Sequence, residues 1–440
     1  MREVLTKILR GPRYACSLGG AMVTVQAIHR GIPVVHAAPG CAYNLYLGQV
    51  IASGFQGQGY IGGACLSTTR LCERDVVYGG EERLRRQLKT TLDIVDGDFV
   101  VIMTGCVSDL IGDNVTAVAK EFNTKEVPVF SVETGGFKGN SFRGYERVLE
   151  AFADHLMEES SSKEKGLVNV FGVVPYQDML WRGNLKEISR VLERLGLEAN
   201  MMLGHRIFGL ESWRKAPRAE LNLLLSPWVG VEFVQEFEQK FGVPHLIFPG
   251  LPIGPTETSK LLRMVGERLD VSKNLVDKVV TEEEKEVYYY LEDTSDLYID
   301  FGWQFNFAVI GETNLVLGVN KFLTNDMGYE PVLTIITDDP PDKYRETIIS
   351  ELTNLDYGLK PEIVFESNSD KIWEILEKSR AQVILGSSLD RPIAVQLGAA
   401  HLSIGCPTVN RLITDNTSCG YKGARELVSD IVTAVMVAST

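Results

Sequence analysis

Short apolar runs rich in β-branched residues alternate with amphipathic segments along the whole chain, and this alternation limits the possible folds most. Ten runs are candidate strands: Ile32–Ala38, Phe99–Thr104, Val127–Val132, Val168–Val174, Asn222–Leu225, His245–Phe248, Phe305–Ile310, Val332–Thr337, Glu362–Phe365 and Gln382–Leu385. The segments with helical periodicity between them include Glu82–Ile94, Arg143–Glu158, Leu185–Leu195, Val231–Phe241, Thr313–Asn325 and Lys371–Lys378. Continuously apolar runs separated by helices are typical of parallel strands covered on both faces. The sequence therefore predicts a doubly wound α/β fold.

Two stretches divide the 440 residues into three units of roughly 150 residues, an ordinary domain size. The first is the polar, serine-rich stretch Met157–Gly166. The second is a long helical segment from about Glu257 to Leu291, after which the alternation of strands and helices resumes. We therefore predict three α/β units at residues 1–163, 164–298 and 299–440. The strand, turn and helix around Gly311 lack the G-x-G-x-x-G spacing, so this unit is interpreted as Rossmann-like without a nucleotide.

Charge and hydropathy exclude several classes of protein. The formal net charge is −14, whereas nucleic-acid-binding proteins show a basic face and anionic membranes attract basic segments. The N-terminal residues have no apolar core of signal-peptide length, and no run of about 18 apolar residues occurs. We therefore expect a cytoplasmic protein that binds neither nucleic acid nor membrane. Motifs of P-loop ATPases, zinc proteases and serine hydrolases are absent, and no catalytic residue is predicted.

Seven cysteines carry the remaining chemical signal, and an odd number argues against a disulfide framework. Cys41 and Cys106 follow the carboxyl ends of two predicted strands, where ligands bind in open α/β sheets. Cys16 precedes small residues that let a bulky group approach the backbone. At Cys106 a helix begins, and its N–H groups and dipole favour a thiolate. Soft thiolates bind iron–sulfur clusters, zinc or copper(I); from spacing alone, small buried residues in tight glycine turns are the alternative.

Three thiolates would leave a cluster that needs four ligands one short. This shortage implies a second chain, a ligand other than cysteine, or a larger cluster shared across an interface. The residues by themselves do not choose among these possibilities.

The residues around these cysteines resemble a known family. The segments "CSLGGA", "GIPVVHAAPGCAYNLYL", "TTRLCERDVVYGGEERL" and "TGCVSDLIGDNV" follow the order of motifs in the first domain of nitrogenase component 1 chains. The similarity continues through "SVETGGFKGNSFRGYE", "LLLSPWVG" and "GCPTVNRLITDNTSCGYKGA", so it covers essentially the whole chain. The resemblance implies three Rossmann-like domains. It also implies that Cys16, Cys41 and Cys106 bind an iron–sulfur cluster (8Fe-7S of the P-cluster type, or 4Fe-4S) shared with a partner chain.

Departures from the family pattern indicate which type of subunit the chain resembles. Ser226 stands where α-type chains have the cysteine that anchors their active-site metallocluster, and His401 is the only histidine of the third unit and does not match their histidine ligand. The resemblance therefore implies a β-type subunit of an α2β2 oxidoreductase. Such a subunit relays electrons from an ATP-dependent 4Fe-4S reductase to the metallocluster of an α-type partner. Gly136 stands where β-type chains have a serine that can bind the oxidised cluster.

Mixed α-type and β-type features favour a nitrogenase-like reductase, with a methylthio-alkane (reduction of a carbon–sulfur bond) or N2 as the substrate. The alternatives are a non-catalytic scaffold for metallocluster assembly and a homodimeric tetrapyrrole reductase. Cys65 and Cys72 are expected to be structural, with a place near the cluster as the alternative; Cys406 and Cys419 are expected to be packing residues. His36 is expected to be a hydrogen-bonded residue beside the cluster or an ordinary core histidine.

Overall fold

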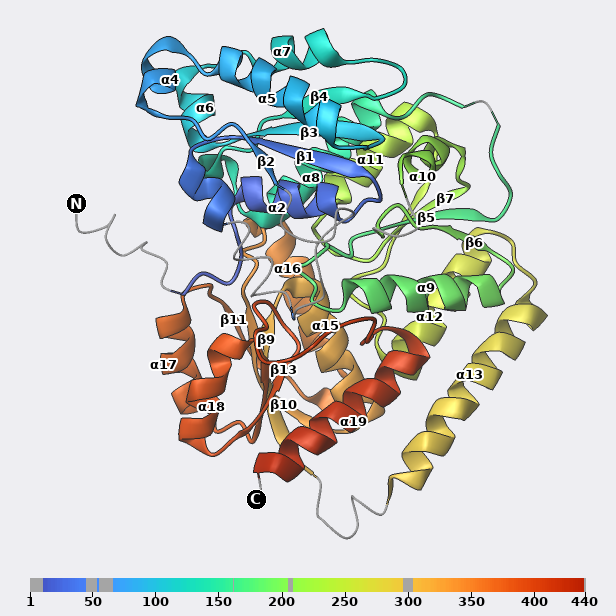
Figure 1. Ribbon diagram of the computed structural model, residues 1–440. Coiled ribbons are helices and arrows are strands. Elements are labelled where there is room, and N and C mark those ends of the chain that lie inside the picture. The colour runs from blue at the N-terminus through green and yellow to red at the C-terminus, as the bar shows by residue number, and fades with distance from the viewer. Residues whose placement is uncertain are drawn as a thin grey trace.

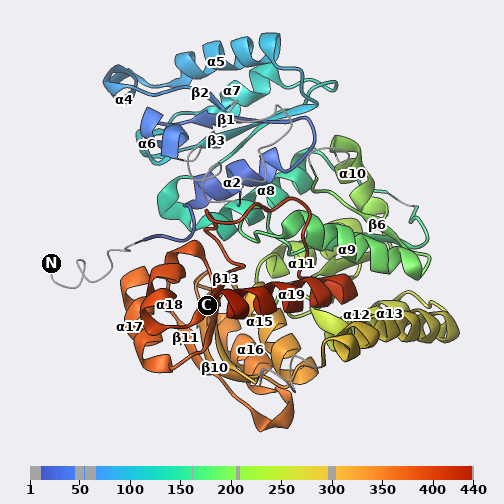
Figure 2. The same cartoon turned by 60° about the horizontal axis from the view of Figure 1, so that its bottom comes forward.

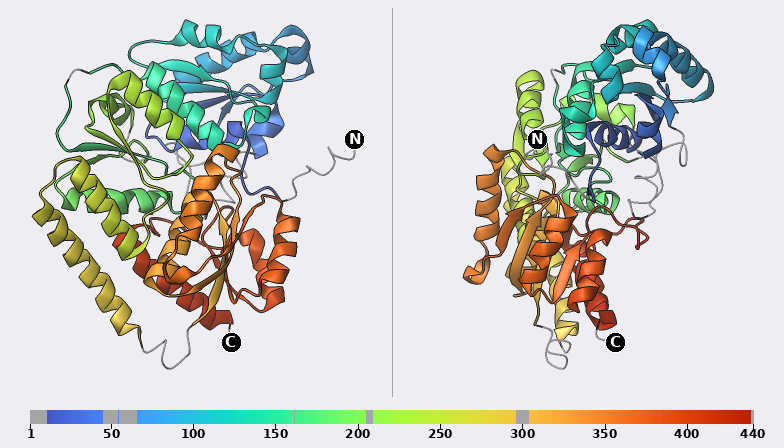
Figure 3. Two further views of the ribbon diagram at one scale, coloured as in Figure 1. Left: turned by 180° about the vertical axis from the view of Figure 1, so that it is seen from behind. Right: turned by 90° about the vertical axis from the view of Figure 1, so that its left-hand side faces the viewer.

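The computed structural model describes residues 11–44, 54, 66–160, 162–204, 209–295 and 304–438. Within these residues the chain forms three parallel sheets, each flanked by helices, with the first sheet at the top of Figure 1 and the third at the bottom. Figures 2 and 3 show the same three layered units from further sides. The predicted class, three doubly wound Rossmann-like α/β units, is confirmed.

The first sheet has the order β2-β1-β3-β4 and carries helices on both faces. Its elements are α2 (Ser17–Gln26), β1 (Gly31–His36), β2 (Ser67–Thr68), α4 (Glu73–Tyr78), α5 (Glu81–Ile94), β3 (Phe99–Thr104), α6 (Cys106–Ile111), α7 (Val115–Phe122), β4 (Val129–Val132), η1 (Gly136–Lys138) and α8 (Ser141–His155). Alternate residues of β3 explain the layering: Val100 and Ile102 pack with α5 and α7, while Val101 and Met103 pack with α2 and α8.

The second sheet has the order β6-β5-β7-β8. Its elements are β5 (Leu167–Phe171), α9 (Trp181–Arg194), β6 (Glu198–Asn200), α10 (Leu210–Lys215), η2 (Ala216–Arg218), β7 (Leu221–Leu224), α11 (Val231–Phe241) and β8 (His245–Ile247). Two helices follow it along one side of the molecule, α12 (Gly254–Arg268) and α13 (Lys273–Asp293) (Figure 1).

The predicted single helical segment from Glu257 to Leu291 is wrong in one respect, because it is two helices. Asp270 has a φ of 52°, in the left-handed region, and the N–H of Val271 donates to the carbonyl of Gly266 (2.8 Å). A left-handed residue closed by such a bond is a common way to end a helix. The periodicity of apolar residues continues across this break, which is why the sequence pattern did not reveal it.

The third sheet has the order β11-β10-β9-β12-β13, in which each half grows outward from β9. Its elements are β9 (Asn306–Gly311), α15 (Thr313–Lys321), η3 (Phe322–Asp326), β10 (Glu330–Ile336), α16 (Asp342–Thr353), η4 (Asp356–Gly358), β11 (Glu362–Phe365), α17 (Ser369–Ser379), β12 (Val383–Gly386), η5 (Ser388–Asp390), α18 (Arg391–Leu397), β13 (Ala400–Ser403) and α19 (Gly420–Ala438). The strand, turn and helix predicted around Gly311 are present as β9 and α15.

All ten predicted strands are present, and every strand pair is parallel. The sequence did not predict β2, β6 and β13. Each predicted unit contains one sheet, while the boundaries proposed for the units stay a prediction. Among the described residues, no helix is long and apolar enough to cross a membrane.

Candidate metal centre

The carboxyl ends of β1 and β3 form the edge at which two of the predicted cysteines lie. These strands are hydrogen-bonded neighbours, with His36 opposite Thr104. The chain continues from β1 to β2 on one side and from β3 to β4 on the other, so this is the point where the strand order reverses. Cys41 lies in a helical turn that begins at residue 39, and Cys106 is the first residue of α6. Ligands bind at such switch points in open α/β sheets.

Cys16 reaches the same place from a different part of the chain. It precedes α2 and forms an isolated backbone bridge with Asn140, and the N–H of Ser17 donates to the carbonyl of Gly139 (2.9 Å). This pairing places Cys16 beside the loop that contains Gly136. A Cβ atom on Gly136 would lie 3.2 Å from Cys106 Sγ and 3.5 Å from Cys16 Sγ. The structure therefore brings Cys16 and Cys106 together on either side of one glycine.

Cys41 completes the group of three thiols. Burial raises the pKa of the Cys41 thiol, and the charges of Cys16 and Cys106 raise that pKa further. Neighbouring thiolates repel one another, and the positive charge of a bound metal offsets this repulsion, so metal binding is coupled to the loss of the thiol protons. Cys16 is exposed, and Cys41 and Cys106 are half-buried. The group therefore opens at the surface, where a second chain can supply further ligands.

The chemistry of the three thiols, which are soft donors, suits an iron–sulfur cluster, zinc or copper(I). Among the described residues, no three His, Cys, Asp or Glu side chains are close enough together to hold a single metal ion. The space between Cys16 and Cys106 is kept free by Gly136, whose N–H donates to Cys106 Sγ (3.0 Å). Hydrogen bonds from backbone N–H groups to sulfur are usual around iron–sulfur clusters. The donor set of three soft thiols and one N–H therefore suits such a cluster.

His36 connects β1 to the helix that starts at Cys106. It is fully buried; its Nε2 lies 2.8 Å from Asp113 Oδ2 and its Nδ1 lies 3.1 Å from Thr69 Oγ1. Its backbone carbonyl accepts the N–H of Gly105 (3.0 Å) and the hydroxyl of Ser108 (2.7 Å). Burial lowers the pKa of His36, although Asp113 acts in the opposite direction. The backbone carbonyl of His36 thus helps to hold the start of the helix that contains Cys106, and its imidazole makes hydrogen bonds with buried groups.

The other cysteines differ in their surroundings. Cys72 is exposed and lines an open hollow of about 810 Å³ together with Pro39, two residues before Cys41, and Val107, the residue after Cys106. Its Sγ lies 3.5 Å from Arg83 Nη2. Cys406 and Cys419 both pack against apolar side chains, and burial raises the pKa of Cys406 to about 12 and that of Cys419 well above its ordinary value. Cys65 lies outside the described residues.

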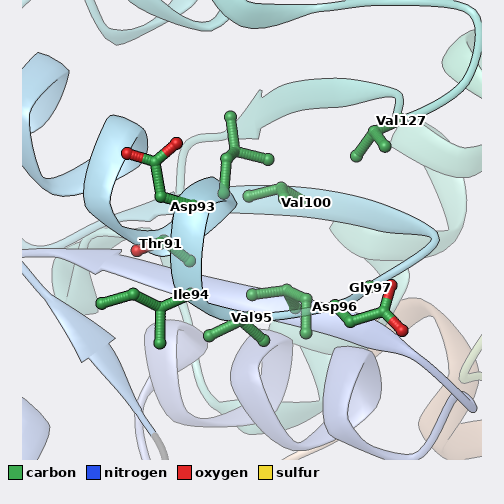
Figure 4. A pocket seen from close by; sticks show the side chains of 10 residues that line it. Thr91, Asp93, Ile94, Val95, Asp96, Gly97, Val100 and Val127 are labelled. Atoms are coloured by element: carbon green, nitrogen blue, oxygen red, sulfur yellow. The ribbon is translucent and has the colours of Figure 1, made fainter.

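A second hollow, of about 240 Å³, lies at the opposite edge of the first sheet (Figure 4). It is lined by the last turn of α5 and by Ile32 and Val100 near the amino ends of β1 and β3. Ligands bind at the carboxyl edge of such sheets, so this hollow is not the predicted site.

Ser226 and His401, the two positions that differ from α-type chains, both make hydrogen bonds within this chain. Ser226 is fully buried, and its Oγ accepts the N–H groups of Trp228 (3.3 Å) and Val229 (3.0 Å). His401 Nε2 lies 2.9 Å from the carbonyl of Ser387. Both side chains are therefore engaged in hydrogen bonds with backbone groups of this chain.

The family resemblance places Gly136 beside the cluster, but it does not predict that the loop of residues 135–138 donates a hydrogen bond there. This loop supplies the N–H that contacts Cys106, and such a backbone group has no signature in the sequence beyond the two adjacent glycines. A Cβ on Gly135 would lie 2.5 Å from Asp109 Oδ2, which shows how closely the loop approaches α6.

Comparison with known proteins identifies the family. Residues 16–436 match the family model of nitrogenase component 1 type oxidoreductases. The chain belongs to this family. It is 24% identical to the nitrogenase vanadium-iron protein beta chain of Trichormus variabilis, over 96% of this chain and 93% of that one. It is 23% identical to the molybdenum-iron protein beta chain of Azotobacter vinelandii, over 99% and 85%.

Two further relatives of this nitrogenase component 1 type chain are informative. It is 24% identical to the nitrogenase iron-molybdenum cofactor biosynthesis protein NifE of Clostridium pasteurianum, over 88% of this chain and 80% of that one. The solved structure described as nitrogenase Cp1 at pH 6.5 superposes with a TM-score of 0.80 at 19% identity, over 98% and 94% of the two chains. The predicted membership of the family as a β-type chain and the predicted fold are both confirmed.

Proposed function

We propose that this chain is the β-type subunit of a nitrogenase-like oxidoreductase, in which Cys16, Cys41 and Cys106 bind one side of an iron–sulfur cluster. One observation carries the proposal: three thiols from separate parts of the chain meet at the switch point of the first sheet, with only Gly136 between two of them. Membership of the nitrogenase component 1 family supports iron–sulfur chemistry at this place.

The second side of the cluster comes from an α-type partner, in an α2β2 assembly. Large apolar side chains are exposed next to the thiols in sequence: Tyr43 follows Cys41, Leu110 lies on α6 after Cys106, and Phe137 follows Gly136. Exposed apolar groups gathered around an open polar site are typical of a protein interface. Burying them against a partner would also remove the cluster from water.

The role of the subunit is electron relay. The bound cluster, of the 8Fe-7S type or a 4Fe-4S cluster, supplies one-electron storage between a donor and an acceptor. The donor is an ATP-dependent 4Fe-4S reductase, and exposed Val77 and Tyr78 on α4 offer an apolar surface near the site for it. The acceptor is the metallocluster of the α-type partner, because Ser226 and His401 of this chain are engaged in internal hydrogen bonds.

The substrate is a methylthio-alkane or N2, and its binding groups lie on the partner. The complex works in the cytoplasm. The similarity to NifE favours one second candidate, a scaffold on which a metallocluster is assembled without turnover. A relay subunit passes electrons from the reduced donor to the partner, whereas a scaffold releases its cluster to an acceptor protein.

The test is iron and sulfide content with electron paramagnetic resonance (EPR) spectra, on protein purified without oxygen, alone and co-expressed with its α-type partner. We expect iron and sulfide in the complex and their loss in Cys106→Ala. Cys72→Ala is the matched control, because Cys72 is an exposed cysteine that lines the same hollow as Val107, the residue after Cys106. An iron-free wild-type complex, or a Cys106→Ala complex with unchanged iron and spectrum, contradicts the proposal. Reoxidation of the cluster signal on addition of substrate distinguishes relay from assembly.

A further inference from the structure

One carboxylate holds the loop that lies against Cys106. Asp109, on α6 one turn after Cys106, accepts the N–H of Gly135 (3.1 Å) and the ammonium of Lys138 (2.9 Å), both through Oδ2. The side chain of Asp109 is 7% exposed. Lys138 also binds Glu133 (2.5 Å), a largely exposed residue before the loop. Asp109 therefore fastens the loop at both of its ends, from the same helix that begins with Cys106.

Gly136 lies between these two attachments, which hold the backbone on either side of it and so fix the orientation of its N–H. That N–H donates to Cys106 Sγ (3.0 Å). A side chain at Gly135 would collide with Asp109 Oδ2, at 2.5 Å from its Cβ, so the loop reaches this position only with glycine there. The N–H···S contact thus depends on the bonds that Asp109 makes with Gly135 and Lys138.

An N–H that donates to a thiolate sulfur withdraws electron density from it. Such bonds favour the more reduced, more negatively charged state of a cluster and raise its reduction potential. The negative charge of Asp109 itself acts in the opposite direction. The two effects therefore differ in sign and can be separated by choosing the substitution.

We propose that Asp109 is a positioning residue that sets the reduction potential of the bound cluster by aiming the Gly136 N–H at Cys106. The inference rests on the proposed function, because it needs a cluster on Cys106. It assigns to Asp109 no contact with the cluster, only the placement of the loop.

The experiment compares Asp109→Ala and Asp109→Asn by EPR-monitored redox titration of the complex. Alanine removes the acceptor and frees the loop, so the midpoint potential should fall even though a negative charge has been lost. Asparagine keeps an acceptor oxygen for Gly135 and should keep the potential at or above that of the wild type. Glu133→Gln is the matched control: it removes a charge bound to Lys138 but leaves the Asp109–Gly135 bond, so the potential should not fall.

A second readout uses metal-free protein. The rate of alkylation of Cys106 should increase roughly tenfold in Asp109→Ala. This is the change expected when the loop loses one hydrogen bond to a charged group and opens more often. Alkylation of Cys16 in the same sample should change little. Iron-loaded Asp109→Ala with an unshifted or raised potential overturns the role of Asp109 alone. An iron-free wild-type complex overturns the proposed function and the role of Asp109 with it.

Discussion

The missing side chain at Gly136 decides which ligands this chain can offer a cluster. The position that would carry a Cβ is 3.2 Å from Cys106 Sγ and 3.5 Å from Cys16 Sγ, so any side chain there would point between the two thiols. Glycine contributes its N–H to Cys106 and nothing else. The ligand set that we propose for this chain is therefore the same three thiolates in every redox state.

We predict that Gly136→Ser introduces a ligand that responds to redox state. A serine oxygen is a harder donor than sulfur and, once deprotonated, favours the oxidised cluster. The midpoint potential should fall and become dependent on pH, because the hydroxyl loses its proton on binding. EPR-monitored titrations at two pH values measure this effect. Gly136→Ala adds the Cβ without the oxygen, and the prediction fails if both variants change the potential equally.

The sequence predicted the three thiols to different degrees. Cys41 and Cys106 follow strand ends, so the parallel fold by itself places them at one edge. Cys16 reaches them only through its pairing with Asn140, a contact between residues far apart in the chain that no local pattern encodes. The N–H of Gly136 is a backbone group, so no side chain in the sequence indicates its contact with Cys106; the sequence shows only that a glycine stands there.

At the scale of elements, the short helix α6 presents different sides to the cluster and to the surface. Cys106 begins it, Asp109 holds the neighbouring loop, and Leu110 is 76% exposed. An exposed leucine next to the proposed cluster has its natural place in the interface with the partner.

We predict that Leu110→Asp weakens association with the α-type partner. Burying one leucine contributes about 1.5–3 kcal/mol, so the dissociation constant should rise roughly 10- to 100-fold. Ile94→Asp is the control, because Ile94 is also 76% exposed but lies in α5 at the opposite edge of the same sheet. Isothermal titration calorimetry or analytical ultracentrifugation measures the difference. Equal weakening by both substitutions would place the interface elsewhere.

Strands were easier to predict than helix ends. Buried parallel strands are apolar throughout, so ten of them were visible in the sequence. The strands that were missed, such as β2 (Ser67–Thr68) and β6 (Glu198–Asn200), are too short or too polar to leave a pattern. The break between α12 and α13 depends on the left-handed backbone of Asp270, a single residue that periodicity does not detect.

At the scale of the whole molecule, a buried ion pair ties the segment before Cys16 to the third unit. Arg13 donates from Nη1 and Nη2 to the two oxygens of Asp390 (2.7 and 2.6 Å), with both side chains almost fully buried. Tyr14 lies 3.1 Å from Thr337 through their hydroxyl oxygens, also in the third unit. The sequence indicated three units but gave no sign of this contact, because its partners are 377 residues apart.

We predict that Arg13→Ala reduces both stability and iron content. Removing one partner leaves the Asp390 charge buried and unpaired, which destabilises a fold by about 3–5 kcal/mol. Urea denaturation measures the stability, and iron per chain measures the effect on Cys16. The double variant Arg13→Met with Asp390→Leu removes both charges and should recover much of the stability. Retention of full iron content in Arg13→Ala would show that Cys16 is positioned by the first unit alone.

Buried carboxylates also mark the region where the three units meet. Burial raises the pKa of Asp178 to about 6 and that of Asp338 to about 6, and it raises the pKa of Glu312 well above its ordinary value. Asp338 accepts the indole N–H of Trp228 from the second unit (3.0 Å), and its carbonyl accepts the amide of Asn140 from the first (2.9 Å). Ionisation of these groups therefore acts against the joining of the units.

The sign of the resulting pH dependence follows from proton binding. An unfolded aspartate titrates near pH 4, so between about pH 4 and pH 6 the folded protein holds protons at Asp178 that the unfolded chain has lost. The free energy of unfolding contributed by Asp178 is then full below that window and falls as pH rises through it, by about 3 kcal/mol. Histidines whose pKa is lowered by burial, such as His36, oppose this trend, because their contribution to the free energy of unfolding rises with pH up to the ordinary histidine value of about 6.5.

We therefore predict how the difference in the free energy of unfolding between the wild type and Asp178→Asn changes with pH, and not the pH dependence of either protein alone. Asp178→Asn keeps an acceptor for the N–H of Leu180 but loses the bond from Asn184, an offset that is the same at every pH. Relative to the wild type, the variant should gain stability as pH rises from about 4 to 7, because only the wild type must ionise or desolvate a buried carboxyl there. Urea denaturation of both proteins across this range measures the gain. A constant difference between them would mean that Asp178 ionises in the folded protein as it does in water, and that the junction is open to solvent.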